Sequence, residues 1–196
     1  MSLVLASKSA ARRALLSGAG VAHQAVVSGV DEEAAKADML AQGLGPAEVA
    51  GALAELKALA VSGRTPGLVI GADQTLDLEG QLYDKAETLT EARARLLLLR
   101  GRTHRLHSAV VLAEAGQVVW RERITASLTM RAFSDAFLDD YLLTEGEAAL
   151  GSVGCYRLEG PGAQLFSRIE GDYFAVLGLP LMGLLAFLRD RGEIAS

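Results

Sequence analysis

The stretch LVLASKSAARRALL, residues 3–16, joins an apolar run to a helix start and decides the fold class. Leu3–Ala6 is short and apolar, which predicts a buried strand. Ser9 has the character of an N-cap, and Leu15 and Leu16 lie on one apolar face of a helix expected over residues 10–18. A buried strand followed at once by a helix indicates an α/β domain.

Two arginines follow the expected N-cap, and they pose an electrostatic question. Arg12 and Arg13 fall in the first turn of the predicted helix. The aligned peptide dipoles make that turn partly positive, so each cation there is disfavoured by about 0.3–1 kcal/mol. A bound anion would reverse the sign of this interaction, because helix N-termini and arginines both attract phosphate.

The alternation of strand and helix continues and predicts a twisted, largely mixed sheet. Further strands are expected over residues 23–28, 67–72 with continuation over 75–78, 104–113, 117–131, 151–159, 164–169 and 172–177. Helices are expected from Pro46 onward and over residues 90–100, 134–144 and 180–191, whereas residues 29–45 are predicted to be polar and irregular. No repeat or linker interrupts the pattern, so residues 1–196 form one predicted domain.

Composition excludes several classes of protein. The chain is 51% hydrophobic and 22% charged, which is typical of a globular domain rather than a disordered segment. Its net charge of −5 disfavours general binding to nucleic acid or to an anionic membrane. The single cysteine can form no internal disulfide, which predicts a cytoplasmic protein. The apolar run near the N-terminus is too short to predict a signal peptide. The apolar stretch over residues 173–188 is interrupted and too short to predict a membrane span.

Familiar nucleotide and metal motifs are absent from the sequence. It contains no G-x-x-x-x-G-K-[ST], no G-x-G-x-x-G after a strand and no H-E-x-x-H. We expect His104 and His107 to be structural or surface residues on opposite faces of a strand, and Cys155 to be a small buried residue.

A few polar residues stand out together. Asp73 directly follows the apolar run GLVIGA, at the expected carboxyl end of a buried strand, where α/β sheets place ligands. Each of the others alone is compatible with a cap, a solvated loop or an exposed surface: Asp31, Glu32, Glu33, Lys57, Lys85 and Arg102. As a set, carboxylates that suit Mg²⁺ or Mn²⁺ and cations that neutralise phosphate predict a site for a metal and a polyphosphate.

Ordered short motifs over nearly the whole chain resemble the Maf family (septum-formation-inhibitor-like proteins). The resemblance rests on LVLASKSAARRALL, SGVDEE, ELKA, IGADQTLDLEGQLYDKA, LRGRTHRLHSAV and GCYRLEGPGAQLFSRIEGDYFAVLGLPL. It implies an elongated α/β fold related to inosine-triphosphate pyrophosphatases, with two lobes, a central cleft and commonly a homodimer. It also implies hydrolysis of a nucleoside triphosphate to a monophosphate and pyrophosphate with a divalent metal, Mg²⁺ or Mn²⁺.

The resemblance also implies roles for particular residues of this sequence. Asp73 corresponds to the catalytic carboxylate and metal ligand, and Glu32 to the second ligand for metal or water. Lys57 and Lys85 correspond to lysines that face the triphosphate. The expected phosphate-binding residues are Ser7, Ser9, Arg12 and Arg13 near the N-terminus, and Arg102 and Thr103 further along. A bound triphosphate would then explain the cations in the first helical turn.

The sequence departs from the family pattern at Ala10, Ala11, Asp84 and Ala86, so only the lysine of a G-K-P triplet is kept. Gln74 and Glu159, with Ala11, are the candidate specificity residues, and they resemble the 7-methyl-GTP branch. A carboxylate can accept hydrogen bonds from the adjacent N1–H and N2–H of guanine. A cationic methylated base also favours an aromatic face, for which Tyr156 is a candidate.

Two further readings of the function stay open. One is a pyrophosphatase for dTTP or UTP, since the guanine assignment depends on few positions. The other is a non-catalytic nucleotide-binding regulator of cell division, suggested by the altered motif positions. Both keep the small-molecule nucleotide as ligand and involve neither nucleic acid nor membrane.

Overall fold

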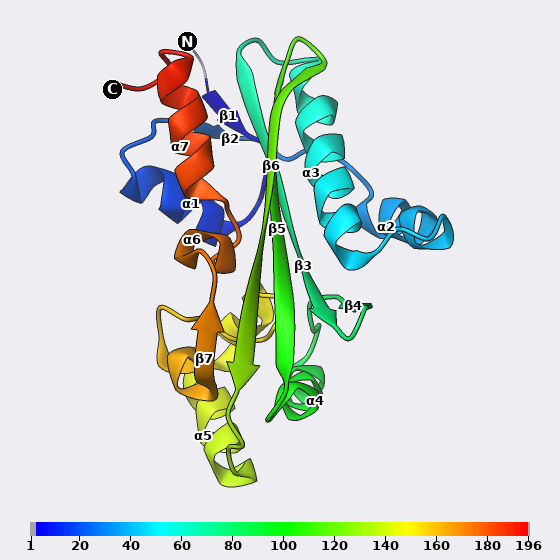
Figure 1. The fold of residues 1–196 in the computed structure, drawn as a ribbon, viewed down its shortest axis with the longest axis vertical. Helices are drawn as coiled ribbons and strands as arrows, with labels where there is room; N and C mark the ends of the chain where they lie inside the picture. The colour runs from blue at the N-terminus through cyan, green and yellow to red at the C-terminus, as the bar shows by residue number, and fades with distance from the viewer. Residues whose placement is uncertain (1–2, 196) are drawn as a thin grey trace.

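The computed structural model describes residues 3–195 and confirms the mixed α/β class (Figure 1). Its sheet has seven strands in the order β2-β1-β3-β5-β6-β7, with β4 also paired to β3. The strands are β1 (Leu3–Leu5), β2 (Gln24–Ala25), β3 (Leu68–Leu78), β4 (Gln81–Tyr83), β5 (Thr103–Glu114), β6 (Gln117–Met130) and β7 (Phe166–Glu170). β1 runs parallel to β2 and β3, and the remaining pairs are antiparallel.

Helices cover the sheet at both ends of an elongated molecule. They are α1 (Ala10–Gly18), α2 (Glu32–Ala41), α3 (Pro46–Ser62), α4 (Leu89–Leu99), α5 (Asp135–Glu145), α6 (Tyr173–Val176) and α7 (Leu181–Asp190), with 3₁₀ turns at Gly146–Gly151 and Pro161–Leu165. Figure 1 shows α1 and α7 across the upper sheet from α3, and α4 and α5 at the lower end. Within residues 3–195, no helix is long and apolar enough to cross a membrane.

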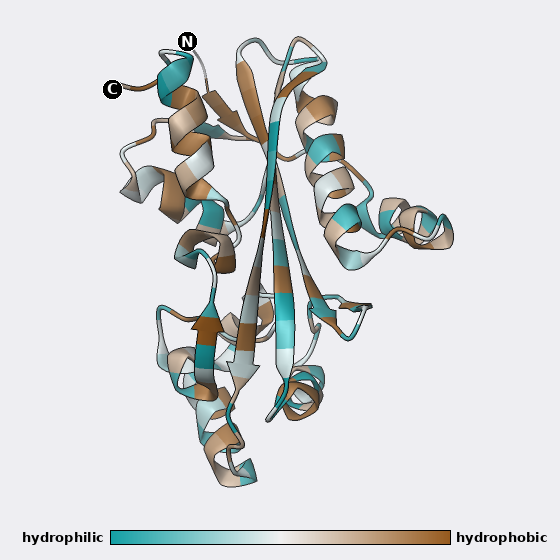
Figure 2. Ribbon diagram, viewed as in Figure 1, coloured by the Kyte–Doolittle hydropathy of each residue, from teal (hydrophilic) through white to brown (hydrophobic). Residues whose placement is uncertain are grey.

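Two apolar clusters stabilise the two ends. The upper one joins β1 and β3 to α1 and α7, with buried Leu5, Leu16, Ile70, Leu112 and Leu184. The lower one joins the far halves of β3, β5 and β6 to α4 and α5, with buried Leu76, Leu96, Leu128, Leu138 and Tyr156. Figure 2 shows the contrast between the uniformly hydrophobic β1 and the mixed colouring of α2. Because β3, β5 and β6 run through both clusters, the two ends share one sheet.

The edge of β3 changes its neighbour part-way along the strand. β1 pairs with β3 as far as Ile70, and the amide of Ala6 donates to the Ile70 carbonyl at 2.8 Å. β4 pairs with β3 only from Leu76 onward. Among the described residues, positions 71–75 therefore have no strand neighbour on this edge, and the sheet is split at Asp73 and Gln74.

Several predictions of local structure need correction. Residues 29–45 are not irregular, because α2 begins after Asp31, whose carboxylate accepts from the amide of Ala34 at 3.0 Å. This helix buries none of its residues, so the sequence has no apolar stripe to reveal it. Residues 172–177 form α6 instead of a strand, since Asp172 caps it, and a short apolar run has no decisive period.

Strand lengths differ from the expectation as well. The second strand spans only two residues, Gln24 and Ala25, within the predicted range 23–28. Residues 151–159 form turns and irregular chain instead of a strand, because the 3₁₀ turn Gly146–Gly151 leads into them and no described strand pairs with them. β3 continues without a break to Leu78, so Asp73 lies in the middle of a strand and not at its end. The gap in the sheet beside Asp73 arises instead from the end of β1, which pairs with β3 only as far as Ile70.

His104, His107 and Cys155 are buried structural residues. His104 Nε2 lies 2.6 Å from the Tyr156 hydroxyl, and burial lowers the pKa of His104 to about 4. On the other face of β5, His107 contacts Thr125 and Asp77 through its two ring nitrogens. Cys155 is fully buried, as expected, and adopts a positive φ of 59°.

Candidate active site

A cavity of about 990 Å³ opens at the split in the sheet edge. The loop after β1 and the first turn of α1 form one wall, and the segment 148–159 from the lower end forms the opposite wall. Asp73 and Gln74 of β3 lie at its base, while Gly178 follows α6. The cavity is therefore a cleft between the two ends of the molecule, as the family resemblance implied.

Gly71 allows α3 to approach the strand that carries Asp73. A Cβ atom at Gly71 would overlap the backbone of Ala54 and Ala58 in α3. Gly71, Asp73 and Thr75 alternate onto the same face of β3, and the Thr75 hydroxyl donates to the Pro46 carbonyl at 2.8 Å. Helix and strand are thus in close contact along this face.

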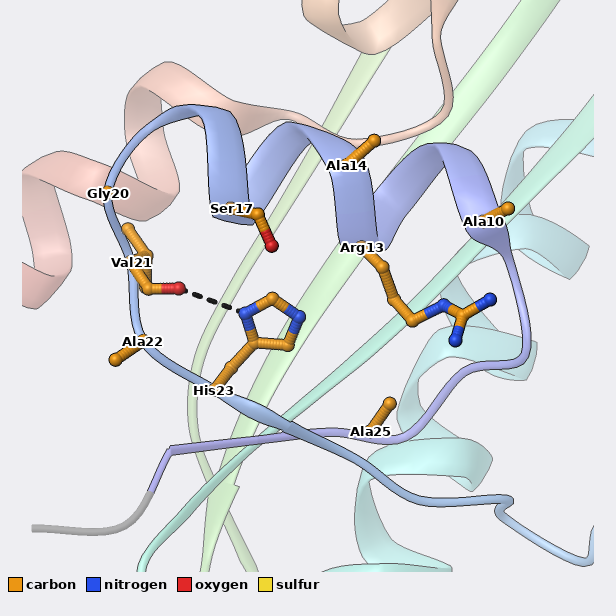
Figure 3. Close-up of a pocket in the computed structure, with 9 residues that line it drawn as sticks. All are labelled: Ala10, Arg13, Ala14, Ser17, Gly20, Val21, Ala22, His23 and Ala25. Atoms are coloured by element: carbon orange, nitrogen blue, oxygen red, sulfur yellow. Dashed lines mark hydrogen bonds between the residues drawn. The ribbon is translucent and has the colours of Figure 1, made fainter.

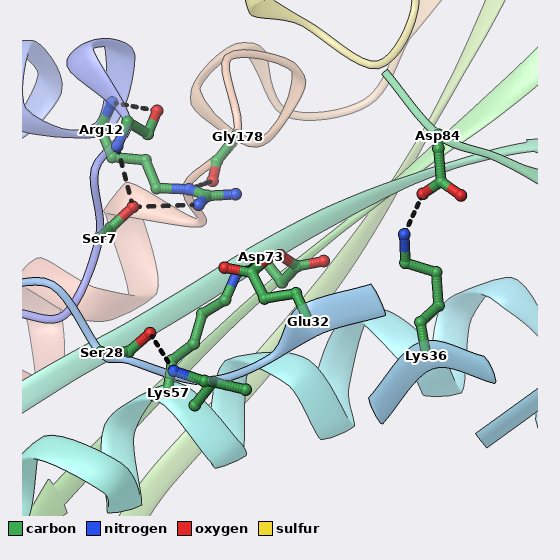
Figure 4. Close-up of polar contacts among 11 residues, drawn as sticks. Ser7, Arg12, Ser28, Glu32, Lys36, Lys57, Asp73, Asp84 and Gly178 are labelled. Carbon is green, nitrogen blue, oxygen red and sulfur yellow. Dashed lines mark hydrogen bonds and ion pairs between the residues drawn. The ribbon is translucent and has the colours of Figure 1, made fainter. Parts of the chain in front are cut away.

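Lys57 bridges the two expected catalytic carboxylates (Figure 4). Its Nζ atom lies 2.7 Å from Asp73 Oδ1 and 2.7 Å from Glu32 Oε2. The side chains of Lys57 and Asp73 are 6% and 11% exposed, whereas that of Glu32 is 48% exposed. Lys57 and Asp73 are therefore buried at the base of the cavity, and Glu32 lies at its open side. Residues from α2, α3 and β3 thereby form one charged centre.

Arg12 is the buried cation on the cavity wall formed by α1. Its Nε atom donates to the Gly178 carbonyl at 2.8 Å, and its Nη1 atom donates to the Ser7 hydroxyl at 3.3 Å. Burial lowers the pKa of Arg12, and the nearby Asp73 and Glu32 carboxylates partly oppose that shift. Nη2 has no hydrogen-bond partner among residues 3–195, which leaves a donor for a ligand. The Ser9 hydroxyl accepts from the Arg12 amide at 3.4 Å and caps α1 as predicted.

Lys85 brings a third cation to the same cavity. Lys85 is an exposed residue, but partial desolvation of its ammonium by the cavity wall lowers the pKa of Lys85, and the positive charges of Arg12 and Lys57 lower it further. Asp73 and Glu32 partly compensate. Within the described chain Lys85 has no ion-pair partner, so an anionic ligand would relieve a mutual repulsion among three cations.

Comparison with known proteins agrees with this geometry. The family of Maf-like proteins matches residues 2–191 of the chain. The chain belongs to the Maf family. A nucleoside triphosphate pyrophosphatase of Caulobacter vibrioides is 61% identical over 98% of this chain and 96% of its own length. One of Granulibacter bethesdensis is 55% identical over 97% and 98%, and a 7-methyl-GTP pyrophosphatase of Rhizobium meliloti is 51% identical over 98% and 97%.

Three expected phosphate ligands of this Maf protein do not line the cavity, so their binding roles stay predictions. Arg13 lines a separate, open hollow of about 730 Å³ between α1 and residues 20–25 (Figure 3). Consecutive helical residues point about 100° apart, so Arg12 and Arg13 point to different sides of α1, and the hollow beside Arg13 adjoins the cavity at Ala10 and Ala14. Arg102 forms an ion pair with Glu79 at 2.5 Å, and the Thr103 hydroxyl lies 2.9 Å from that of Thr129.

The specificity candidates take different positions in the Maf cavity. Ala11 and Glu159 line it, and Glu159 is exposed with no ion-pair partner among the described residues. Gln74 also lines it, but its Nε2 atom donates to the carbonyls of Ala175 and Val176, each at 3.0 Å. Gln74 therefore holds α6, and with it the turn that carries the Gly178 carbonyl, against β3.

Tyr156 does not provide the free aromatic face that the sequence suggested. A Cβ atom on Gly154 would overlap the Tyr156 ring, so the backbone at Gly154 covers one face. Phe166 packs against the ring in an edge-on contact, with centroids 4.7 Å apart. The hydroxyl is held by His104, and the residue is 5% exposed. Tyr156 thus supports the cavity wall.

Sequence reasoning missed two contributors to the cavity wall. Gly178 has a φ of 101° and supplies its carbonyl to Arg12 from 166 positions away. Arg157 reaches the cavity while its Nε atom pairs with buried Glu145 at 2.8 Å. The sequence shows Gly178 two residues before a proline and Arg157 directly after Tyr156. No local pattern connects either residue to α1 or β3.

The donor set fits a hard divalent cation shared with a substrate. Asp73 and Glu32 offer carboxylate oxygens that converge on one ammonium position. Among residues 3–195 no group of three or more His, Cys, Asp or Glu could hold a metal by itself. Mg²⁺ commonly takes one or two protein carboxylates together with water and substrate phosphates, so a pair of carboxylates is compatible with such a cation.

Proposed function

We propose that this Maf protein is a nucleoside triphosphate pyrophosphatase that releases a nucleoside monophosphate and pyrophosphate. One observation supports this most directly: the Lys57-bridged pair of Asp73 and Glu32 lies in the same cavity as Arg12 and Lys85. Carboxylates suit the activation of water, and the cations suit a triphosphate. The names of the similar proteins support the same reaction class.

The reaction assigns a task to each group. Asp73 accepts a proton from water, and the water oxygen bonds to the α-phosphorus while the bond to the bridging α–β oxygen breaks. The bond electrons leave with pyrophosphate, whose negative charge Arg12 and Lys85 neutralise. Lys57 keeps Asp73 and Glu32 together and oriented. Glu32 and Asp73 would hold a divalent cation, Mg²⁺ or Mn²⁺, which when bound supplies further neutralisation of phosphate charge.

We infer 7-methyl-GTP, or another modified or non-canonical nucleotide, as the preferred substrate, with dTTP or UTP as the alternative. Glu159 lines the cavity and has no protein ion-pair partner within the described chain, so its carboxylate is free to accept from guanine N1–H and N2–H. The acceptor–donor–acceptor edge of uracil or thymine suits an amide better. The Rhizobium meliloti relative named 7-methyl-GTP pyrophosphatase supports this choice.

Glu159→Gln is expected to change base preference while pyrophosphate release is retained. The amide loses one charge and half of its acceptor capacity, so the preference for guanine-type over pyrimidine substrates should fall by about 10-fold or more, the value of one charged hydrogen bond. Steady-state kcat/KM for 7-methyl-GTP, GTP, dTTP and UTP measures this. Glu147→Gln, an exposed residue outside the cavity, is the matched control. An unchanged preference in Glu159→Gln contradicts the assignment.

The lowered pKa of Lys85 predicts a pH dependence. Protonated Lys85 attracts the triphosphate, and its pKa lies below the ordinary 10.5 because of partial desolvation and neighbouring cations. The value of kcat/KM, which reports the free enzyme, should therefore decline as pH rises through a range below 10.5. In Lys85→Arg the guanidinium stays charged, so this decline should move to higher pH. An identical alkaline decline in both proteins would remove Lys85 from this role.

The non-catalytic regulator is less well supported by the site. Nucleotide binding alone needs the cations but not a buried carboxylate held by Lys57 beside the cavity. Saturable nucleotide binding with no pyrophosphate release for any base, with Mg²⁺ or Mn²⁺, would favour it. The homodimer and the cytoplasmic location remain predictions that accompany the enzyme assignment.

A further inference from the structure

An ion pair outside the cavity joins two of the elements that supply its charged residues. Lys36 of α2 pairs with Asp84, which directly precedes Lys85 in the loop after β4 (Figure 4). Neither Lys36 nor Asp84 lines the cavity. Asp84 is also one of the positions at which the chain departs from the G-K-P pattern, so the departure creates a contact that a glycine could not make.

The helix α2 depends on such contacts for its position. None of its side chains is buried, so little apolar packing holds it against the rest of the molecule. Glu32 and Lys36 are one helical turn apart and therefore share a face. On that face Glu32 pairs with Lys57 and Lys36 pairs with Asp84. The Lys36 side chain is 17% exposed and that of Asp84 is 62% exposed, so the ammonium is largely shielded while the carboxylate faces solvent.

The loop on the other side of the pair is fixed from the lower end of the molecule. Arg95 of α4 donates through Nη1 to the Asp84 carbonyl at 2.8 Å and to the Val153 carbonyl at 2.9 Å. Its guanidinium also lies over the Tyr83 ring, 4.6 Å from the centroid. The backbone of Asp84 is thus held by α4, and its carboxylate binds Lys36 of α2, one residue before Lys85.

We propose that Lys36 and Asp84 are positioning residues, whose ion pair holds α2 and the Lys85 loop together so that Glu32 and Lys85 face the same substrate. The catalytic part of this inference rests on the proposed pyrophosphatase function. Loss of the pair removes one of the two ion pairs on this face of α2, so the helix is freer to move relative to the Lys85 loop. The pair then contributes to turnover without touching the nucleotide.

Amide hydrogen exchange tests the structural half without any substrate. In Lys36→Gln and in Asp84→Asn, exchange over residues 32–41 should become about two- to fivefold faster, the range that exposed and partly exposed ion pairs contribute. The charge-swapped double variant Lys36→Asp with Asp84→Lys should recover most of the protection. Arg93→Gln, which breaks the 2.8 Å pair with Asp139 between α4 and α5, is the control and should leave α2 unchanged.

Kinetics with the four nucleotides tests the catalytic half. Each single variant should lower kcat by about two- to fivefold with a smaller change in KM, and the double variant Lys36→Gln with Asp84→Asn should lose no more than either single one. The swap should restore kcat, with the melting temperature of all variants unchanged.

Three results would overturn the inference: unchanged exchange in α2, faster exchange with unchanged kcat, or losses that add in the double variant. If the wild-type protein releases no pyrophosphate from any nucleotide, the proposed function fails. The exchange experiment then still decides whether the ion pair holds α2.

Discussion

Asp73→Asn is expected to abolish measurable pyrophosphate release while the protein stays folded. The amide has the size of the carboxylate but cannot accept a proton from water, and general bases of this kind contribute about 10²–10⁴-fold to rate. Lys57 retains its contact with Glu32, so the buried ammonium keeps one negative partner. We therefore expect kcat to fall by about 10³-fold with a small change in nucleotide affinity.

A coupled pyrophosphate assay with Mg²⁺ and with Mn²⁺ measures this loss, and near-ultraviolet circular dichroism checks the fold. Asp190→Asn provides the matched control, since it makes the same chemical change at an exposed position near the end of α7. The control should keep wild-type activity. Equal pyrophosphate release by Asp73→Asn and the wild type would refute the assignment of Asp73 as the base.

Gly71→Ala is expected to lower both stability and activity, although it adds only one methyl group. That group would overlap the backbone of Ala54 and Ala58, which cannot rotate away as a side chain can. Overpacking of a close contact typically costs about 1–3 kcal/mol. For a chain of this size the melting temperature should fall by roughly 2–12 °C. Because α3 carries Lys57, its displacement should also lower kcat.

Gly51→Ala separates this effect from the general consequence of replacing a glycine. Gly51 lies in the same helix, and a Cβ atom there meets nothing within 4 Å. Alanine in a helix interior is favoured over glycine by about 0.5–1 kcal/mol, so this variant should be slightly more stable than the wild type. Thermal unfolding and pyrophosphate release, measured on both variants, make the comparison. A Gly71→Ala protein as stable and active as Gly51→Ala would contradict the close-packing account.

Local patterns in the sequence predicted the elements with strong periodicity or clear caps. The N-cap at Ser9, the helix begun by Pro46 and the long hairpin of β5 and β6 are all present. The helix α2 was missed because a helix that buries no residue has no apolar stripe to detect. For α6 the apolar run was visible, but four residues are too few to distinguish helix from strand.

The expected site residues likewise fall into two groups: those that line the cavity and those that do not. Asp73, Glu32, Lys57, Lys85 and Arg12 all reach one cavity, as the ordered motifs implied. Arg13 does not, because helical geometry turns it away from its neighbour. Arg102 and Thr103 were grouped with the phosphate ligands from their motif alone, but their side chains contact Glu79 and Thr129 outside the cavity. A motif identifies residue types, whereas side-chain direction depends on the element that carries them.

By itself, the sequence determined the α/β class, the family and the chemical types of residue in the site. These properties are encoded locally, in the apolar period, the caps and the short motifs. Only the tertiary structure decided which charges meet: Lys57 with Asp73 and Glu32, Arg12 with Gly178, and Lys36 with Asp84. These contacts join residues 16 to 166 positions apart. They depend on the close approach of α3 at Gly71 and on the split edge of β3, which no local pattern specifies.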